Sequence, residues 1–208
     1  MRDRETQERY GPDVSRRSFL KGSGVAVAAT AIATAAEEAL AQDKKAASAA
    51  PSSKAQDIEL TINGEVHKLK LEPRVTLLDA IRNDCHLTGC KEVCTTKNCG
   101  ACTVMIDGKA VYACTRLAVA EQGKKITTVE ALSAGGKVDP VIPCFIKHDA
   151  TQCGYCTPGF VVATRAFLND HPKATLEEIQ KGLGGNLCRC GTYDGVAKCA
   201  LELAKGGA

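Results

Sequence analysis

The sequence contains no tryptophan, and aromatic residues make up only 4% of its 208 positions. The net charge is only +3, and no arginine-rich run lies beside aromatic residues, so nucleic-acid binding has little support. The longest uncharged apolar run, Gly22 to Ala36, is made mostly of alanine and glycine. It is shorter than the roughly 20 residues that a membrane-spanning helix needs. Cysteine is absent before Cys85, yet the chain has twelve.

The N-terminal segment has the features of an export signal. Ser15-Arg16-Arg17-Ser18-Phe19-Leu20-Lys21 matches the twin-arginine pattern, and an apolar run and the cleavage motif Ala39-Leu40-Ala41 follow it. We therefore expect residues 1–41 to be a twin-arginine signal peptide and residues 42–56, rich in Ala, Ser and Lys, to be a flexible linker. This route carries folded proteins, so it suits a periplasmic protein whose metal clusters are assembled in the cytoplasm.

The first group of cysteines follows a pattern of short strands. Ile58, Leu60 and Ile62 alternate with polar residues, and Asn63-Gly64 predicts a hairpin turn into a strand ending near Leu71. A capping box at Thr76 predicts a short helix through Arg82. The remaining features are a cysteine loop and a hairpin over Thr103–Cys114, which together predict a β-grasp domain over residues 57–134.

The spacing of these cysteines, C-x4-C-x2-C with a distant fourth, is typical of plant-type ferredoxins. It predicts a [2Fe–2S] cluster on Cys94, Cys99, Cys102 and Cys114. Gly100 lets the backbone pass close to the cluster, where N–H groups bond to sulfur.

The second group of cysteines lies among predicted helices. Asp139-Pro140 begins one helix, with Ile142, Phe145 and Ile146 expected on its apolar face. Further helices are expected from Pro158, from the capping box at Thr175, and around Val196–Leu203. The fold class expected for the whole chain is α+β, with residues 135–208 forming a four-helix domain whose metal lies between helix-connecting loops.

Two motifs in this region resemble a known family. Gln152-Cys153-Gly154-Tyr155-Cys156-Thr157-Pro158-Gly159 and Gly185-Asn186-Leu187-Cys188-Arg189-Cys190-Gly191 look like the second-cluster signature of the molybdenum hydroxylases. The resemblance runs from Asp57 to the C-terminus, and the export leader makes the iron–sulfur subunits of periplasmic aldehyde oxidoreductases the nearest match. It implies a second [2Fe–2S] cluster on Cys153, Cys156, Cys188 and Cys190. It also implies that Gln152 lies next to the pterin and that Cys190 is hydrogen-bonded toward it.

The resemblance implies a role in electron transfer with no substrate chemistry on this chain, so no catalytic residue is expected. Electrons would pass from a molybdopterin-binding large subunit to an FAD subunit or a periplasmic acceptor. Molybdopterin and FAD are thus expected on partner subunits. Substrates other than aldehydes (purines, N-heterocycles or carbon monoxide) remain open, as does a free-standing two-cluster ferredoxin.

The first cysteine loop departs from the family pattern. The family usually has Thr at the position of Cys90 and Gly at the position of Val93. It usually has Gly or an acidic residue at the position of Thr95, and Gly at the position of Lys97. We expect Lys97 to raise the potential of the first cluster, because reduction adds negative charge nearby. The thiols of Cys85, Cys90, Cys144 and Cys199 are expected to be buried and to serve only in core packing.

Two other uses of cysteine compete with iron. A disulfide scaffold suits an oxidising compartment, but the Gly-flanked ligand spacing and export in the folded state oppose it. Zinc would suit the C-x2-C and C-x-C pairs, although the first spacing favours iron and sulfide. The four histidines, His67, His86, His148 and His171, show no pairing at metal-ligand spacing, and we expect them at the surface.

Overall fold

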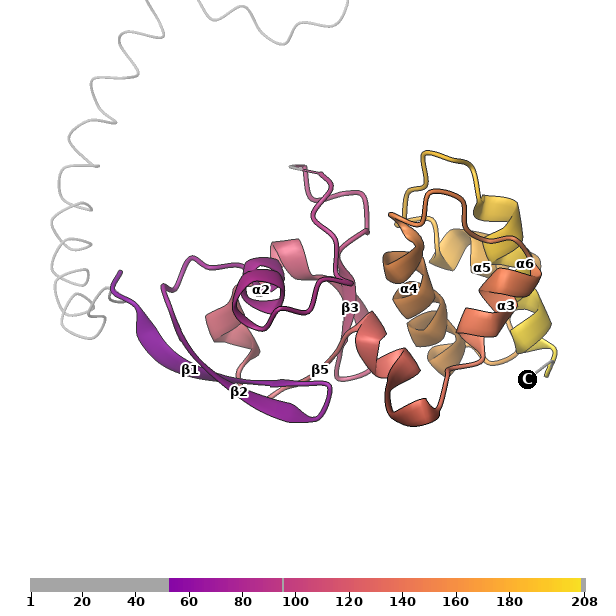
Figure 1. The fold of residues 1–208 in the computed structure, drawn as a ribbon. Helices are drawn as coiled ribbons and strands as arrows, with labels where there is room; N and C mark the ends of the chain where they lie inside the picture. Colours follow the sequence, from indigo (N-terminus) through magenta and orange to yellow (C-terminus); the bar gives the residue numbers. More distant parts are fainter. Residues whose placement is uncertain (1–52, 95, 207–208) are drawn as a thin grey trace, which may run out of the picture. The chain divides into compact units, whose positions relative to one another are not determined.

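The computed structural model describes residues 53–94 and 96–206 (Figure 1). The expected signal peptide, most of the expected linker and Thr95 lie outside these residues. Within the described part of the chain, no helix is both long and apolar enough to cross a bilayer.

The first half of the described chain forms a mixed five-stranded sheet in the order β2-β1-β5-β3-β4. β1 pairs in parallel with β5, and the other pairings are antiparallel. The strands are β1 (Gln56–Ile62), β2 (Glu65–Leu71), β3 (Thr103–Ile106), β4 (Lys109–Tyr112) and β5 (Lys125–Thr127). The expected turn at Asn63-Gly64 is confirmed, since both residues have positive φ, as a tight hairpin turn requires.

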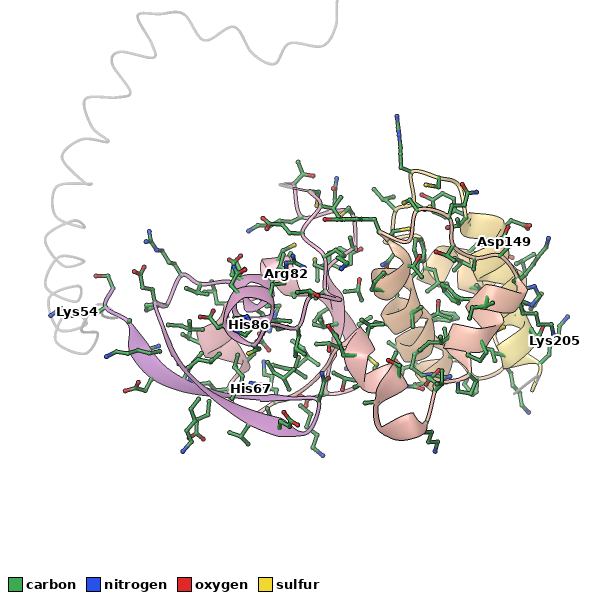
Figure 2. All side chains as sticks on the ribbon, viewed as in Figure 1. Lys54, His67, Arg82, His86, Asp149 and Lys205 are labelled. Atoms are coloured by element: carbon green, nitrogen blue, oxygen red, sulfur yellow. The ribbon has the colours of Figure 1, made fainter. Side chains whose placement is uncertain are left out.

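A short helix covers one face of this sheet. α2 (Leu77–Asp79) begins at Thr76, whose hydroxyl accepts from the Asp79 N–H, and continues into η1 (Ala80–Asp84). Leu77, Leu78 and Ile81 pack with Ile58 and the other inward residues of the sheet. Arg82, labelled beside α2 in Figure 2, donates to the carbonyl oxygens of Thr88 and Cys90 and so holds the start of the cysteine loop.

Three 3₁₀ segments follow β4. The first two, η2 (Ala113–Thr115) and η3 (Ala118–Glu121), lie between β4 and β5, and η4 (Val129–Gly136) leads from β5 to the helices. The expected strand through Cys114 is therefore wrong in its last residues, because β4 ends at Tyr112 and Cys114 lies in η2. The expected domain boundary between residues 134 and 135 falls inside η4 and stays a prediction.

The second half consists of the helices α3 (Val141–Lys147), α4 (Thr157–Asp170), α5 (Leu176–Gly182) and α6 (Tyr193–Ala204). The capping box at Thr175 is confirmed, with both reciprocal hydrogen bonds to Glu178 present. Val141, Cys144 and Phe145 are the buried residues of α3. The expectation that Ile146 faces the core is wrong, because its side chain is 73% exposed.

Helix α4 also packs on the sheet. Val162 and Ala166 of α4 form a small core with Met105 of β3. Gly159 makes this approach possible, because a Cβ there would lie 2.5 Å from the carbonyl oxygen of Gly100. The contact brings the N-terminal end of α4 against the loop that carries the first cysteines.

Candidate metal centres

The first set of four cysteines converges from two places in the chain. Cys94, Cys99 and Cys102 lie in the loop before β3, and Cys114 lies in the turn after β4. The thiols of Cys94 and Cys99 hydrogen bond to each other, as do those of Cys102 and Cys114. Burial first, and then the neighbouring sulfurs of the other three, raises the pKa of Cys114 to about 12. Four thiols this close repel one another as thiolates, and a bound cation would relieve that repulsion.

Backbone N–H groups support this set. A hydrogen bond from Cys99, and then the backbone N–H of Asn98, lowers the pKa of Cys94 to about 6. Lys97 and Gly100 have φ of 59° and 71°, and such turns direct successive N–H groups toward one side of the chain. The loop is therefore suited to negative sulfur, as a cluster requires.

Gly100 occupies a position that admits no side chain. A Cβ there would lie 2.7 Å from the side-chain carbon of Asn186 and 2.9 Å from its Cα. The buried Asn186 amide donates to the Gly100 carbonyl over 2.9 Å and to the Thr103 hydroxyl over 3.2 Å. The expected close passage of the Gly100 backbone to a cluster stays a prediction, and the close approach that the structure shows is to Asn186 of the helical half.

The second set of four cysteines comes from the turns before α4 and α6. The thiols of Cys153 and Cys190 hydrogen bond to each other, as do those of Cys156 and Cys188. Burial first, then the hydrogen bond and charge of Cys188 and the charge of Cys153, raises the pKa of Cys156 to about 12. The four thiols therefore lie close enough to interact electrostatically.

Hydrogen-bond donors favour the thiolate form of the cysteines in the second set too. Burial alone would raise the pKa of Cys188, but donors from the Thr192 hydroxyl and N–H, 3.1 and 3.5 Å away, outweigh it. The pKa of Cys188 accordingly falls to about 7. The backbone N–H of Tyr155 likewise lowers the pKa of Cys153. The donor set at both sites fits a metal–sulfur group.

The two sets differ in exposure. Cys99 and Cys102 of the first set are buried, whereas Cys153 and Cys190 of the second are exposed. Gln152 is exposed next to Cys153, so it lies on the open side of the second set.

The remaining cysteines only partly follow the expectation of burial. Cys90, Cys144 and Cys199 are buried, but Cys85 is only half-buried, so that expectation is wrong for Cys85. The Cys90 thiol donates to the Cys102 carbonyl over 3.3 Å, directly behind the first set.

One histidine also departs from the sequence expectation. His148 is partly buried, and its Nε2 lies 2.7 Å from a carboxylate oxygen of Glu202. The expectation that His148 lies at the surface is therefore wrong. The spacing of the histidines carried no signal of this contact, because Glu202 is distant in sequence.

Several residues that position the two sets were not assigned a role from the sequence. They are Thr103, Asn186, Leu187 and Thr192. Asn186 and Leu187 stand inside the Gly-Asn-Leu-Cys motif, which was the available signal for them.

Comparisons with known protein families match both halves of the chain. Residues 60–144 match the 2Fe-2S iron-sulfur cluster binding domain, and residues 128–201 match the [2Fe-2S] binding domain. The aldehyde oxidoreductase iron-sulfur-binding subunit PaoA of Escherichia coli strain K12 is 37% identical over 96% of this chain and 91% of its own length. The chain belongs to the iron–sulfur subunits of the molybdenum hydroxylases.

Other relatives match about three quarters of this chain. The nicotine 6-hydroxylase small subunit of Paenarthrobacter nicotinovorans is 41% identical over 70% of this chain and 88% of its own length. The crystal structure of quinoline 2-oxidoreductase from Pseudomonas putida 86 contains a chain 38% identical, with a TM-score of 0.67, covering 74% of this chain and 99% of that one. The expected α+β class, with a β-grasp sheet followed by a helical domain, is confirmed.

This iron–sulfur subunit carries two [2Fe–2S] clusters and transfers electrons within a multi-subunit molybdenum hydroxylase. Residues 13–33 match the twin-arginine translocation pathway signal sequence, which confirms the expected export to the periplasm.

Proposed function

We propose that the two sets of converging cysteines are the cluster ligands. Cys94, Cys99, Cys102 and Cys114 hold one [2Fe–2S] cluster, and Cys153, Cys156, Cys188 and Cys190 hold the other. Their mutual hydrogen bonds and the N–H groups around Cys94 and Cys188 support this assignment. When bound, each cluster takes up and gives back one electron with little rearrangement.

Electrons enter at the second set and leave from the first. The observation that supports transfer between the two sets is a direct hydrogen bond between the residue before Cys188 and Cys99 of the first set. The N–H of Leu187, next to Cys188, donates over 2.9 Å to the carbonyl oxygen of Cys99. A short route through bonds therefore joins one proposed ligand of each cluster. The exposure of Cys153 and Cys190 favours the second set as the entry point from a molybdopterin subunit, with Gln152 beside it.

The substrate of the complex is an aldehyde, oxidised to its acid with water on the molybdopterin-binding large subunit. The support is the relative PaoA, whose similarity covers 96% of this chain. The N-heterocycle relative, nicotine 6-hydroxylase, covers 70%. The final acceptor is an FAD subunit or a periplasmic carrier.

The ligand assignment is tested by electron paramagnetic resonance of the dithionite-reduced subunit, with iron counted alongside. We expect two distinct spin-half signals and about four irons per chain. Cys102→Ser should remove one signal and Cys156→Ser the other, whereas Cys85→Ser should keep both. Loss of both signals, or of neither, in the two ligand variants would contradict the assignment.

The direction of transfer and the substrate class are tested on the assembled complex. Freeze-quench spectra after mixing with an aldehyde should show the signal lost in Cys156→Ser appearing before the signal lost in Cys102→Ser. The reverse order would refute the proposed route. Reduction by nicotinate or xanthine but by no aldehyde would replace the substrate class and leave the route intact.

A further inference from the structure

Three potential metal ligands meet between α3 and α6, outside both proposed cluster sites. They are Cys144 of α3, His148, which directly follows α3, and Glu202 of α6, and their ligand atoms all lie within 4.8 Å of one another. His148 comes four residues after Cys144 and its N–H donates to the Cys144 carbonyl oxygen, so the two residues lie one turn apart at the end of the helix. Glu202 faces them from α6, which packs against α3 (Figure 1).

We propose that Cys144, His148 and Glu202 form a binding site for a zinc ion. A thiolate, an imidazole and a carboxylate are the three donor types that zinc takes in proteins. In a tetrahedral site with bonds of 2.0–2.3 Å, neighbouring ligand atoms lie about 3.3–3.8 Å apart. The three atoms need only small side-chain rotations to reach that spacing.

Two of the three ligands can carry the negative charge that a divalent cation needs. The Cys144 thiolate and the Glu202 carboxylate supply it, and His148 binds as a neutral ring. Lys147 Nζ lies 2.7 Å from Glu202 Oε1 and 2.8 Å from Oε2, and His148 Nε2 lies 2.7 Å from Oε2. Lys147 thus holds both carboxylate oxygens, and a bound zinc ion would share Oε2 with it.

The group of ligand atoms within 4.8 Å of one another holds three residues and not Cys199, whose carbonyl oxygen accepts from the Cys144 thiol over 3.5 Å. The fourth ligand would be water, or the Cys199 thiol after a side-chain rotation. Cys144 is 6% exposed, whereas the His148 and Glu202 side chains are 22% and 28% exposed. His148 and Glu202 line a surface depression of about 430 Å³, together with Lys198 and Lys205. An ion would reach the buried Cys144 thiol from this depression. In Figure 2, Asp149 and Lys205 are labelled near the ends of α3 and α6.

The site is separate from the second cluster. The cysteines Cys188 and Cys190 precede α6, whereas Glu202 is near its other end. From Tyr193 to Glu202 the helix rises roughly 14 Å. We therefore assign the zinc a structural role, clamping α3 to α6. In an oxidising compartment it would also keep the adjacent thiols of Cys144 and Cys199 from pairing.

The test uses the mature subunit purified from the periplasm with its clusters, equilibrated with zinc against a competing chelator. We expect one zinc ion per chain with the iron count unchanged. X-ray absorption at the zinc edge should give one or two sulfur neighbours at about 2.3 Å and the rest nitrogen or oxygen at about 2.0–2.1 Å. An all-sulfur shell with iron loss would mean that zinc had entered a cluster site, and would overturn the proposal.

Matched variants identify the ligands. Glu202→Gln, at a partly exposed position, and Cys144→Ser should each weaken zinc binding more than about a hundredfold, the upper range for loss of an outer-shell partner. Asp194→Asn on the same helix and Cys85→Ser should leave zinc binding unchanged. Equal effects in variants and controls, or a Cys144–Cys199 disulfide in the purified subunit by mass spectrometry, would refute the site.

Discussion

At the scale of single residues, the first cysteine loop combines an unusual side chain with a backbone that favours glycine. Lys97 has a φ of 59°, a region where side chains are disfavoured, so glycine would suit this position. The Lys97 N–H nevertheless donates toward Cys94, which keeps the loop in the shape that supports a thiolate. The lysine charge thus lies in a loop whose backbone N–H groups support a thiolate.

We expect Lys97→Gln to lower the midpoint potential of the first cluster by roughly 20 mV. This figure corresponds to about 0.5 kcal/mol for a unit charge some 8 Å away in water. Lys97→Gly should give the same shift and also relieve about 1 kcal/mol of backbone strain. A redox titration followed by paramagnetic resonance measures the potential, with the distant Lys68→Gln as control. An unchanged potential in Lys97→Gly would show that the charge has no effect.

Gly100→Ala tests the contact between the first loop and Asn186. The Cβ would lie 2.7 Å from Asn186 in addition to its unfavourable φ of 71°, so we expect about 2–4 kcal/mol of destabilisation and loss of the first cluster's iron. Gly108→Ala is the matched control, since its φ is 83° but nothing lies within 4 Å. Iron analysis and thermal unfolding measure the result. Equal losses of stability and iron in both variants would mean that the positive φ, and not the contact with Asn186, causes them.

At the scale of elements, a buried carboxylate joins the turns after β4. The Glu121 side chain at the end of η3 is fully buried, and it accepts from Arg116 over 2.7 Å and from Lys124 over 2.9 Å. Burial alone would raise the pKa of Glu121, but the two hydrogen bonds outweigh it and hold the pKa below its ordinary value of 4.5. The ionised carboxylate thus stabilises the fold at pH values above 4.5, and this stabilisation is lost as the pH falls through the lowered pKa of Glu121.

We expect Glu121→Gln to lower the free energy of unfolding by about 1–3 kcal/mol at pH 7, a value reduced because both cationic partners are partly exposed. The difference from the parent protein should shrink as the pH falls below 4.5 and through the lowered pKa of Glu121, because the parent's carboxylate then becomes protonated. Urea unfolding at several pH values measures it. Glu72→Gln removes an exposed ion pair with Arg74 and should change stability little. A constant difference at all pH values would contradict the assigned charge.

At the scale of the whole molecule, the subunit joins two cysteine-bearing halves through the small apolar core of α4 on β3 and through several polar contacts. Leu187 bonds to Cys99, Asn186 to Gly100, and the Tyr112 hydroxyl to the Gly185 carbonyl over 2.6 Å. These contacts form only when both halves are folded, which agrees with export of the finished protein by the twin-arginine route.

We expect the double substitution Arg16→Lys and Arg17→Lys to abolish export, because the twin arginines are the defining part of the signal. The subunit should then accumulate in the cytoplasm with its clusters present. Cell fractionation with immunodetection and whole-cell paramagnetic resonance measure both. Arg4→Lys with Arg9→Lys is the matched control and should be exported normally. Periplasmic delivery of the double variant would refute the route.

Much of the fold could be predicted from the sequence because its signals are local. The strand alternation around Leu60, the Asn63-Gly64 turn and the capping box at Thr175 each depend on residues a few positions apart. The assignment of the eight cysteines to two clusters stays a proposal. The first set was predicted from local cysteine spacing and the second from the family resemblance. The misplaced Ile146 and the strand assigned at Cys114 occur where local patterns were weak.

Other features were decided only by the tertiary structure, because they join residues distant in sequence. The spacing of residues in the sequence predicts neither the hydrogen bond from Leu187 to Cys99 nor the close contact of Asn186 with Gly100. The same is true of His148 and Glu202, whose helices meet only when the four-helix domain closes. Local patterns thus determined what each segment of this subunit is and which cysteines it offers. Packing alone determined how the two sets are linked, because a contact between distant segments exists only once the chain has folded.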